Sequence, residues 1–209
     1  MTFDLLGSIP KGPIWVACSG GMDSVFAADF LRQVPSREIG LAYFNHGTTY
    51  STDAEALVTR LADHWRLPLK IGRIKDTDVP AKVSQEEHWR NERYAFLDTF
   101  DAPVITGHNL DDNVETWVWT SCHGTPHVIP YRRNNVIRPF MLVRRADIQK
   151  WAERKGMLWI DDPSNMDLRF MRNYIRHCLL PHALRVNPGL HQVVSRKVRE
   201  QICNKSVTF

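Results

Sequence analysis

Four short apolar runs alternate, along the first half of the chain, with longer stretches in which apolar residues recur every three or four positions. The runs cover residues 13–18, 39–44, 67–74 and 102–106. Their lengths and the turn residues around them are typical of buried strands. The longer stretches, at 22–34, 51–65 and 84–100, have the spacing of amphipathic helices. Because strand and helix alternate, we predict an α/β fold: a Rossmann-like, mostly parallel sheet with helices on both faces.

Hydroxyl side chains mark two of these helix starts. We predict Ser51 and Ser84 as N-caps, with Glu87 in the capping-box position three residues after Ser84.

After residue 110 the strand pattern fades. Helices are predicted at 110–122, 144–156 and 167–184, with short extended pieces at 136–140 and 157–160. Since no linker-like segment interrupts the chain, we expect a single domain over residues 1–209. Its core would lie at about 13–140, and a basic helical extension at about 141–209.

Charge is divided unevenly along the chain. Residues 1–130 contain 11 Lys and Arg against 17 Asp and Glu, whereas residues 131–209 contain 16 against 6. A C-terminal third this basic is typical of a surface that binds a polyanion, although solvated helices give the same balance.

The composition favours a cytoplasmic protein without a membrane partner. No apolar run reaches the roughly 18 residues of a membrane span, and the N-terminus lacks the pattern of a signal peptide. Four scattered cysteines, with no C-x-x-C pair, indicate reduced thiols rather than disulfides or a cysteine metal site.

A glycine loop joins the first predicted strand to the first predicted helix. Its residues are Ser19, Gly20, Gly21, Met22, Asp23 and Ser24. Glycines let backbone N–H groups approach a ligand, and the helix behind adds its positive N-terminal dipole. Asp23 would repel a bare phosphate, so it fits best beside a Mg²⁺ that lies between them. The loop therefore predicts a site for a magnesium-bound phosphate chain, without a Walker lysine or a dinucleotide fingerprint.

Acids and histidines follow other predicted strand ends. Asp111, Asp112 and Glu115 open the helix after the fourth strand, where carboxylates can hold Mg²⁺ (Asp112 together with Asp23) or take a proton from an amine. The dipole of any helix also favours acids in its first turn, so that alternative stays open. His46 and His108 follow the second and fourth strands and are either nucleotide ligands or structural hydrogen-bonding groups.

Arginines recur at helical spacing. Arg169, Arg172 and Arg176 form a stripe of guanidinium groups suited to a phosphate backbone, so we predict that they bind RNA. Arg90 and Arg93 lie three residues apart on an earlier helix, where a surface ion pair with Glu86 is the alternative to a ligand contact.

The motif S-G-G-M-D-S resembles the pyrophosphate loop of the ATP-pyrophosphatase, or PP-loop, superfamily. Later motifs are Y-F-N-H-G at 43–47, R-N-E-R-Y at 90–94, T-G-H-N-L-D-D-N-V-E-T at 106–116, I-R-P at 137–139, D-P-S-N at 162–165 and R-N-Y-I-R-H-C-L-L-P at 172–181. In order and spacing, the series resembles the N-terminal catalytic domain of the tRNA(Ile)-lysidine synthases over about residues 13 to 185.

This resemblance implies an ATP-dependent ligase. Such an enzyme adenylates the carbon-2 oxygen of the wobble cytidine in an isoleucine tRNA with a CAU anticodon, and free lysine then displaces AMP. Carried over by position, it implies ATP binding by Ser19 to Ser24 with His46 and His108, Mg²⁺ near Asp23, action on the lysine amine by Asp111, Asp112 or Glu115, and a tRNA- or nucleotide-facing role for Arg90 and Arg93.

The chain also departs from that family. Asn109 replaces the second of two histidines, and His123 stands where a more basic residue is usual. Family members usually continue into further C-terminal tRNA-binding domains, which we expect to be absent here. Two alternatives stay open: another PP-loop adenylating enzyme acting on RNA, such as a tRNA thiolation enzyme, and a non-catalytic nucleic-acid-binding relative.

Overall fold

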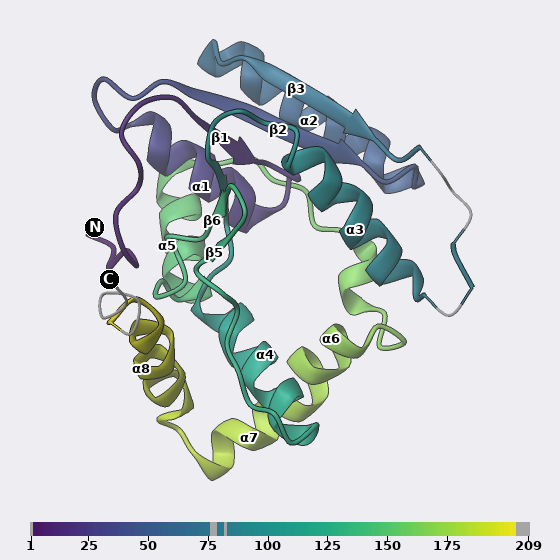
Figure 1. Cartoon of the computed structure of the whole chain (residues 1–209), viewed down its shortest axis with the longest axis vertical. Helices are drawn as coiled ribbons and strands as arrows, with labels where there is room; N and C mark the ends of the chain where they lie inside the picture. The colour runs from purple at the N-terminus through teal and green to yellow at the C-terminus, as the bar shows by residue number, and fades with distance from the viewer. Residues whose placement is uncertain (1, 76–78, 82, 204–209) are drawn as a thin grey trace.

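A six-stranded sheet forms the centre of the computed structural model, which describes residues 2–75, 79–81 and 83–203 (Figure 1). The strand order is β3-β2-β1-β4-β6-β5, and every pairing is parallel except that of β5 with β6. The strands are β1 (Ile14–Ala17), β2 (Ile39–Asn45), β3 (Leu69–Arg73), β4 (Val104–Thr106), β5 (Arg132–Arg133) and β6 (Val136–Ile137). The predicted α/β class and its four leading strands are confirmed.

Helices connect and flank these strands. They are α1 (Met22–Arg32), α2 (Thr49–Trp65), α3 (Gln85–Leu97), α4 (Leu110–Cys122), α5 (Arg145–Lys155), α6 (Met171–Tyr174), α7 (Leu180–Val186) and α8 (Leu190–Cys203). A 3₁₀ turn at Pro163–Met166 precedes α6, and a π-helical turn at Ile175–Leu179 joins α6 to α7. In the described part of the chain, no helix is both long and apolar enough to cross a membrane.

Two details of the predicted elements were wrong. Ser51 does not cap α2: the Thr48 side chain accepts from the Ser51 N–H, so the helix begins one turn earlier, whereas Ser84 does cap α3. Residues 157–160, predicted as a short extended piece, pair with no strand; the Ile160 N–H bonds to the Gly20 carbonyl of the glycine loop. The helix predicted at 167–184 begins only at Met171 and changes to π geometry on its way to α7.

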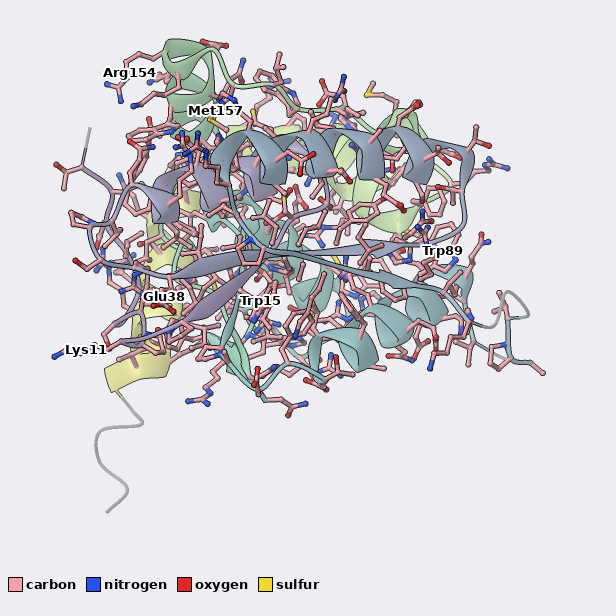
Figure 2. All side chains as sticks on the ribbon, turned by 90° about the horizontal axis from the view of Figure 1, so that it is seen from above. Lys11, Trp15, Glu38, Trp89, Arg154 and Met157 are labelled. Atoms are coloured by element: carbon pink, nitrogen blue, oxygen red, sulfur yellow. The ribbon has the colours of Figure 1, made fainter. Side chains whose placement is uncertain are left out.

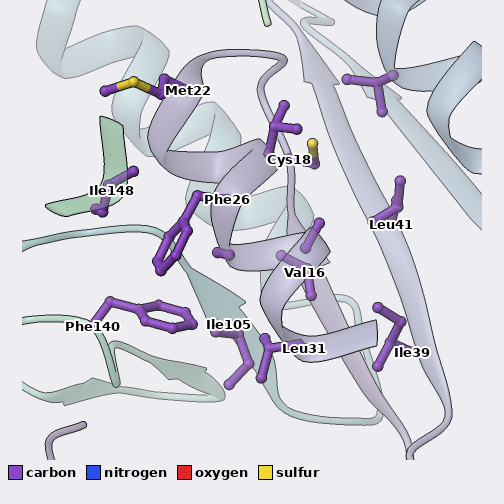
Figure 3. Close-up of a cluster of buried hydrophobic side chains, with 14 of the residues drawn as sticks. Val16, Cys18, Met22, Phe26, Leu31, Ile39, Leu41, Ile105, Phe140 and Ile148 are labelled. Atoms are coloured by element: carbon purple, nitrogen blue, oxygen red, sulfur yellow. The ribbon is translucent and has the colours of Figure 1, made fainter. Parts of the chain in front are cut away.

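Alternating residues of the strands bury two different faces of the sheet. On one face Val16, Leu41 and Ile105 pack with α1, α2 and α5 in the largest core cluster (Figure 3). On the other face Ala42, Val104 and Val136 pack with Tyr94 and neighbouring residues of α3. Figure 2 shows the sheet nearly edge-on between these helix layers. Helices therefore cover both faces, as the near-continuous apolar strands predict.

The C-terminal helices build a second, smaller core. Val194 and Val198 of α8 pack against Val114 of α4, Leu180 of α7 and Leu6 near the N-terminus. Arg199 and Asp4 form an ion pair between α8 and the N-terminal segment. This packing fixes α8 beside α4, so that both ends of the described chain support the helix that carries the predicted acids.

Candidate active site at the carboxyl ends of the strands

The glycine loop leads from β1 into α1 and presents its backbone at the rim of the sheet. Gly20 has φ +83°, a conformation that L side chains rarely adopt. The first N–H groups of a helix have no acceptor within the helix. Gly21, the N-cap of α1, has no side chain to accept from them. Such groups, together with the helix dipole, favour an anion.

A close approach of backbone fixes the loop against β4. A Cβ on Gly107, just after β4, would lie 2.4 Å from the backbone oxygen of Asp23 and 3.1 Å from the Ser24 nitrogen. Only glycine therefore lets the end of β4 lie against the first turn of α1. This close contact brings the two predicted halves of the site together.

Ser24 holds the loop in shape. Its hydroxyl donates to the Gly21 carbonyl (2.8 Å) and accepts from the Ser19 N–H (3.0 Å), and the side chain is buried. The hydroxyl of Ser19 lies 3.2 Å from that of Ser24, at the exposed side of the loop. The structure thus gives Ser24 a positioning role, while Ser19 keeps its predicted access to a ligand.

Asp23 has a buried carboxylate oxygen without a hydrogen-bond partner and lies near other acids. Its Oδ2 lies 3.5 Å from Nη1 of Arg145, whereas its buried Oδ1 has no hydrogen-bond partner. Burial and the nearby carboxylates of Asp112 and Asp111 raise the pKa of Asp23 to about 6, although Arg145 and Arg176 oppose that shift. A divalent cation bound to phosphate would supply the missing partner and relieve the repulsion, so Asp23 fits the predicted Mg²⁺.

Asp112 already accepts hydrogen bonds at both of its carboxylate oxygens. Its Oδ2 accepts the Asn109 N–H (2.9 Å) in a reciprocal capping box, and its Oδ1 accepts from Nη2 of Arg172 (2.8 Å). Burial acts to raise the pKa of Asp112, but the charge of Arg172, the nearby His108 and the Asn109 hydrogen bond lower it overall. Since each oxygen keeps a second lone pair, the magnesium contact of Asp112 stays a prediction. No group of three or more His, Cys, Asp or Glu residues in the described segments is arranged to hold a metal.

Glu115 binds two arginines at once. Nε of Arg172 lies 3.0 Å from its Oε2, and Nε of Arg176 lies 2.6 Å from its Oε1. The side chain of Glu115 is 3% exposed, so this is a largely buried ion pair. Arg172 lies on α6 and Arg176 lies in the π-helical turn, which packs against α4.

The predicted RNA-binding stripe is therefore divided. The guanidinium groups of Arg172 and Arg176 form ion pairs with Asp112 and Glu115. Arg169 is 91% exposed and pairs with Asp167. Spacing alone did not reveal this partnership, which joins residues 57 to 61 positions apart. Contact of the three arginines with RNA stays a prediction.

Asp111 connects the site to the last helix. Its Oδ2 accepts the Arg145 N–H (2.8 Å), and its Oδ1 lies 3.1 Å from Nε2 of His191 on α8. Burial alone would raise the pKa of Asp111, but these two hydrogen bonds and the charge of Arg144 lower it overall. Sequence reasoning missed His191, because nothing in its surroundings marks a histidine 80 residues away as a partner of this acid.

Both predicted histidines are held as neutral bases. Nδ1 of His108 lies 2.8 Å from the Thr106 hydroxyl, and burial lowers the pKa of His108 to about 3. His46 packs against Phe44 and Trp89, and burial with the nearby Arg93 lowers its pKa to about 4. Nδ1 of His46 is buried without a hydrogen-bond partner, which leaves it available to a ligand.

Arg90 and Arg93 extend the site toward α3. Their guanidinium carbons lie 5.5 and 5.7 Å from the ring centre of Tyr94, whose hydroxyl accepts from Nη2 of Arg138 (2.7 Å). The alternative for Arg90 and Arg93, an ion pair with Glu86, is not formed, and their contact with tRNA or nucleotide stays a prediction. Tyr94 and Arg138 lie within quoted motifs, R-N-E-R-Y and I-R-P, but the sequence did not show that they meet.

Comparisons with known proteins identify the family of this chain. The family model described as a PP-loop domain matches residues 3–183. A tRNA(Ile)-lysidine synthase from Pseudomonas putida is 29% identical over 203 residues, which cover 89% of this chain and 47% of that protein. Its counterpart from Thermosipho africanus is 32% identical over 203 residues, covering 88% and 47%. The chain thus spans about half the length of the curated relatives it matches.

Solved structures share the fold. The U34-tRNA thiolase NcsA from Methanococcus maripaludis, a protein with a [4Fe-4S] cluster, has a TM-score of 0.68 at 17% identity, covering 93% of this chain and 74% of that one. The NH3-dependent NAD synthetase from Campylobacter jejuni has a TM-score of 0.52 at 14% identity, covering 97% and 90%. Since the family model covers most of the chain, from the first strand through the arginines of the π-helical turn, the protein belongs to the PP-loop domain family.

Proposed function

We propose that this protein is an ATP-dependent ligase that joins lysine to carbon 2 of the wobble cytidine in an isoleucine tRNA with a CAU anticodon. The observation that carries the proposal is the meeting of the glycine loop with the α4 acids. Asp112 and Asp111 lie near enough to Asp23 to raise its pKa. A phosphate-binding loop and carboxylates that attract an amine thus share one rim, as an adenylating ligase requires. Similarity to the tRNA(Ile)-lysidine synthases across most of this chain supports the same reaction.

The first step is adenylation. The carbon-2 oxygen of cytidine attacks the α-phosphorus of ATP, and pyrophosphate leaves. Backbone N–H groups of the loop and the α1 dipole stabilise the charge that develops on the phosphates. Mg²⁺, held by Asp23 and phosphate oxygens, would neutralise part of that charge. Ser24 and Gly107 keep the loop rigid, so little reorganisation is needed when the nucleotide binds.

The second step replaces AMP by lysine. The lysine amine attacks carbon 2, the bond to the adenylate oxygen breaks, and AMP departs with its electron pair. The amine must lose a proton, and the base is one of Asp111, Asp112 and Glu115. Arg172 and Arg176 hold Asp112 and Glu115 in place, so these acids are positioned to orient an ammonium group.

The test is AMP release from ATP and Mg²⁺ by the full chain, with lysine and the CAU isoleucine tRNA added or left out. We expect AMP only when both are present, and loss of that AMP in Asp23→Asn. Asp63→Asn, which changes an exposed acid on α2, is the matched control and should behave as wild type. Turnover without lysine would instead favour a thiolation-type enzyme, and no turnover under any condition would favour a non-catalytic relative.

A further inference from the structure

Four arginines surround one tyrosine at the edge of the site. The guanidinium carbons of Arg90, Arg93, Arg133 and Arg138 lie 5.5, 5.7, 4.2 and 6.0 Å from the ring centre of Tyr94. We call these four residues the arginine cage. They come from α3, from β5 and from the residue after β6, so three separate segments bring their positive charge to one place.

The arginine cage has no negative partner of its own. Among the residues that the structure describes, no carboxylate lies within ion-pair distance of any of the four. Arg138 is 1% exposed, and its buried Nε has no hydrogen-bond acceptor. Burial, together with the charges of Arg90, Arg172 and Arg138, lowers the pKa of Arg93. The aromatic ring attracts each cation but cannot balance four, so an anion is the missing component.

The cage is held open by its own framework rather than by a ligand. Asn134 bonds to Asp98 (2.9 Å), and Asn135 bonds to the Leu97 carbonyl (2.8 Å), so the β5–β6 turn is fixed to the end of α3. Arg138 donates to the Pro130 carbonyl and to the Tyr94 hydroxyl, both at 2.7 Å. These hydrogen bonds fix the Tyr94 ring and the turn that carries Arg133, and guanidinium groups that stand over the ring suit the forked recognition of phosphate oxygens.

The position of the cage indicates which phosphate it receives. The glycine loop follows β1, the acids follow β4, and Arg138 follows β6, in the order in which these parallel strands lie side by side. The acids therefore lie between the loop and the cage along the rim. ATP whose phosphates bind the glycine loop does not reach the arginine cage. An RNA whose base reaches the acids would place its backbone phosphates on the far side of the acids from the loop, where the cage lies. Arg90 and Arg133 are exposed, as an RNA backbone requires.

We propose that the arginine cage around Tyr94 binds phosphate groups of the RNA backbone and so positions the RNA for the chemistry at the acids. Arg133 thereby gains an RNA-binding role beside that predicted for Arg90 and Arg93, while the buried Arg138 holds the Tyr94 hydroxyl in place. This inference rests on the proposed RNA substrate and deepens it, because it says where the backbone lies. Phosphate contacts set register and orientation but carry no sequence information.

The experiment measures tRNA affinity of the full chain over a series of salt concentrations. For Arg133→Ala and for Arg90→Ala we expect affinity to fall about 3- to 10-fold, and the slope of log K against log salt to shrink by about 1 for each lost contact. The loss should be the same for the isoleucine tRNA and for an unrelated tRNA. An unchanged affinity and slope in both variants would overturn the proposal.

Arg154→Ala is the matched control. Arg154 is also an exposed arginine over an aromatic ring, 5.2 Å from the centre of Trp151, but it lies on α5, across the sheet from α3 (Figure 2). It should leave both affinity and slope unchanged. A thermal melt of each variant verifies folding, and because Arg90 and Arg133 are exposed we expect melting temperatures close to wild type.

A second arm separates the two sources of phosphate. ATP affinity should stay at the wild-type value in both cage variants, and weaker ATP binding with an unchanged tRNA slope would overturn the proposal in favour of a nucleotide site. The outcome is also separable from the proposed function. If the cage variants reduce the salt slope but the protein shows no lysine-dependent AMP release, the cage binds RNA and the proposed ligase activity is wrong. If the protein releases AMP with lysine but the cage variants leave the slope unchanged, the ligase activity stands and the proposal for the cage is wrong.

Discussion

Two groups of arginines lie near the acids and differ in their partners. Arg172 and Arg176 contact Asp112 and Glu115 at 2.6 to 3.0 Å, whereas the arginine cage around Tyr94 has no carboxylate partner in the described chain. RNA contact of the first group stays a prediction; in the structure its guanidinium groups bind the acids. The positive charge of the second group is not balanced by a described carboxylate and is available to a ligand. The difference teaches that a charged residue becomes a binding residue only when the fold leaves its charge uncompensated.

The largest effect should come from the acid beside the glycine loop. Asp23→Asn removes the carboxylate that fits Mg²⁺, so we expect AMP formation to fall about 10³-fold, equal to about 4 kcal/mol of transition-state stabilisation. Single-turnover AMP release measures it. Arg133→Ala, which removes one cage residue, should lower the rate at saturating tRNA far less; equal losses in the two variants would remove the distinction between the regions.

The next largest effect should come from the ion pairs of Glu115 with Arg172 and Arg176. Glu115→Gln leaves two guanidinium groups without their buried carboxylate, so we expect the free energy of unfolding to fall by about 3 kcal/mol. Urea denaturation at neutral pH measures this change. Glu153→Gln on α5, whose carboxylate is exposed and contacts only Gln149 among the described side chains, is the control and should change stability by less than about 0.5 kcal/mol.

The raised pKa of Asp23 should make the stability of the protein depend on pH. Since its pKa is about 6 when folded and 3.8 ordinarily, the folded protein binds this proton more tightly than the unfolded chain. Stability therefore falls as pH rises from about 4 to about 6, by about 2 kcal/mol from this group. Asp23→Asn should lack that part of the fall. If both proteins gave parallel curves of stability against pH, Asp23 would not carry the raised pKa.

The smallest effect should have the opposite sign. Arg93→Met replaces a partly buried, unpaired cation by an apolar side chain, so we expect the free energy of unfolding to rise by about 1 kcal/mol. The same denaturation experiment measures it. A loss as large as that of Glu115→Gln would mean that Arg93 has an internal partner, and the contrast between the two arginine groups would be wrong.

The sequence predicted the sheet and the rim but not the contacts between distant helices. Apolar runs give strand positions directly, and the strand-to-helix junction at Gly20 and Gly21 gives the loop, because both depend on neighbouring residues. The pairs Arg172–Glu115 and His191–Asp111 depend on how α6 and α8 dock on α4. Periodicity shows which residues share a helix face but not what that face meets.

Local chemistry also limited the prediction at finer scale. Thr48 and Ser51 both offer hydroxyls at the start of α2, and the pattern favoured the one nearest the apolar positions. The structure uses Thr48 as the cap, while the Ser51 hydroxyl bonds to it at 2.8 Å. Gly107 gave no signal at all, since its need for a missing Cβ arises only where β4 meets α1.

The most direct test of the account is a crystal structure of the protein with ATP, Mg²⁺ and the anticodon stem-loop of the CAU isoleucine tRNA. We expect the triphosphate on the N–H groups of the glycine loop, the wobble cytidine beside the α4 acids, and backbone phosphates on Arg133 and Arg90. RNA phosphates on Arg172 and Arg176, with the arginine cage facing solvent, would contradict the account.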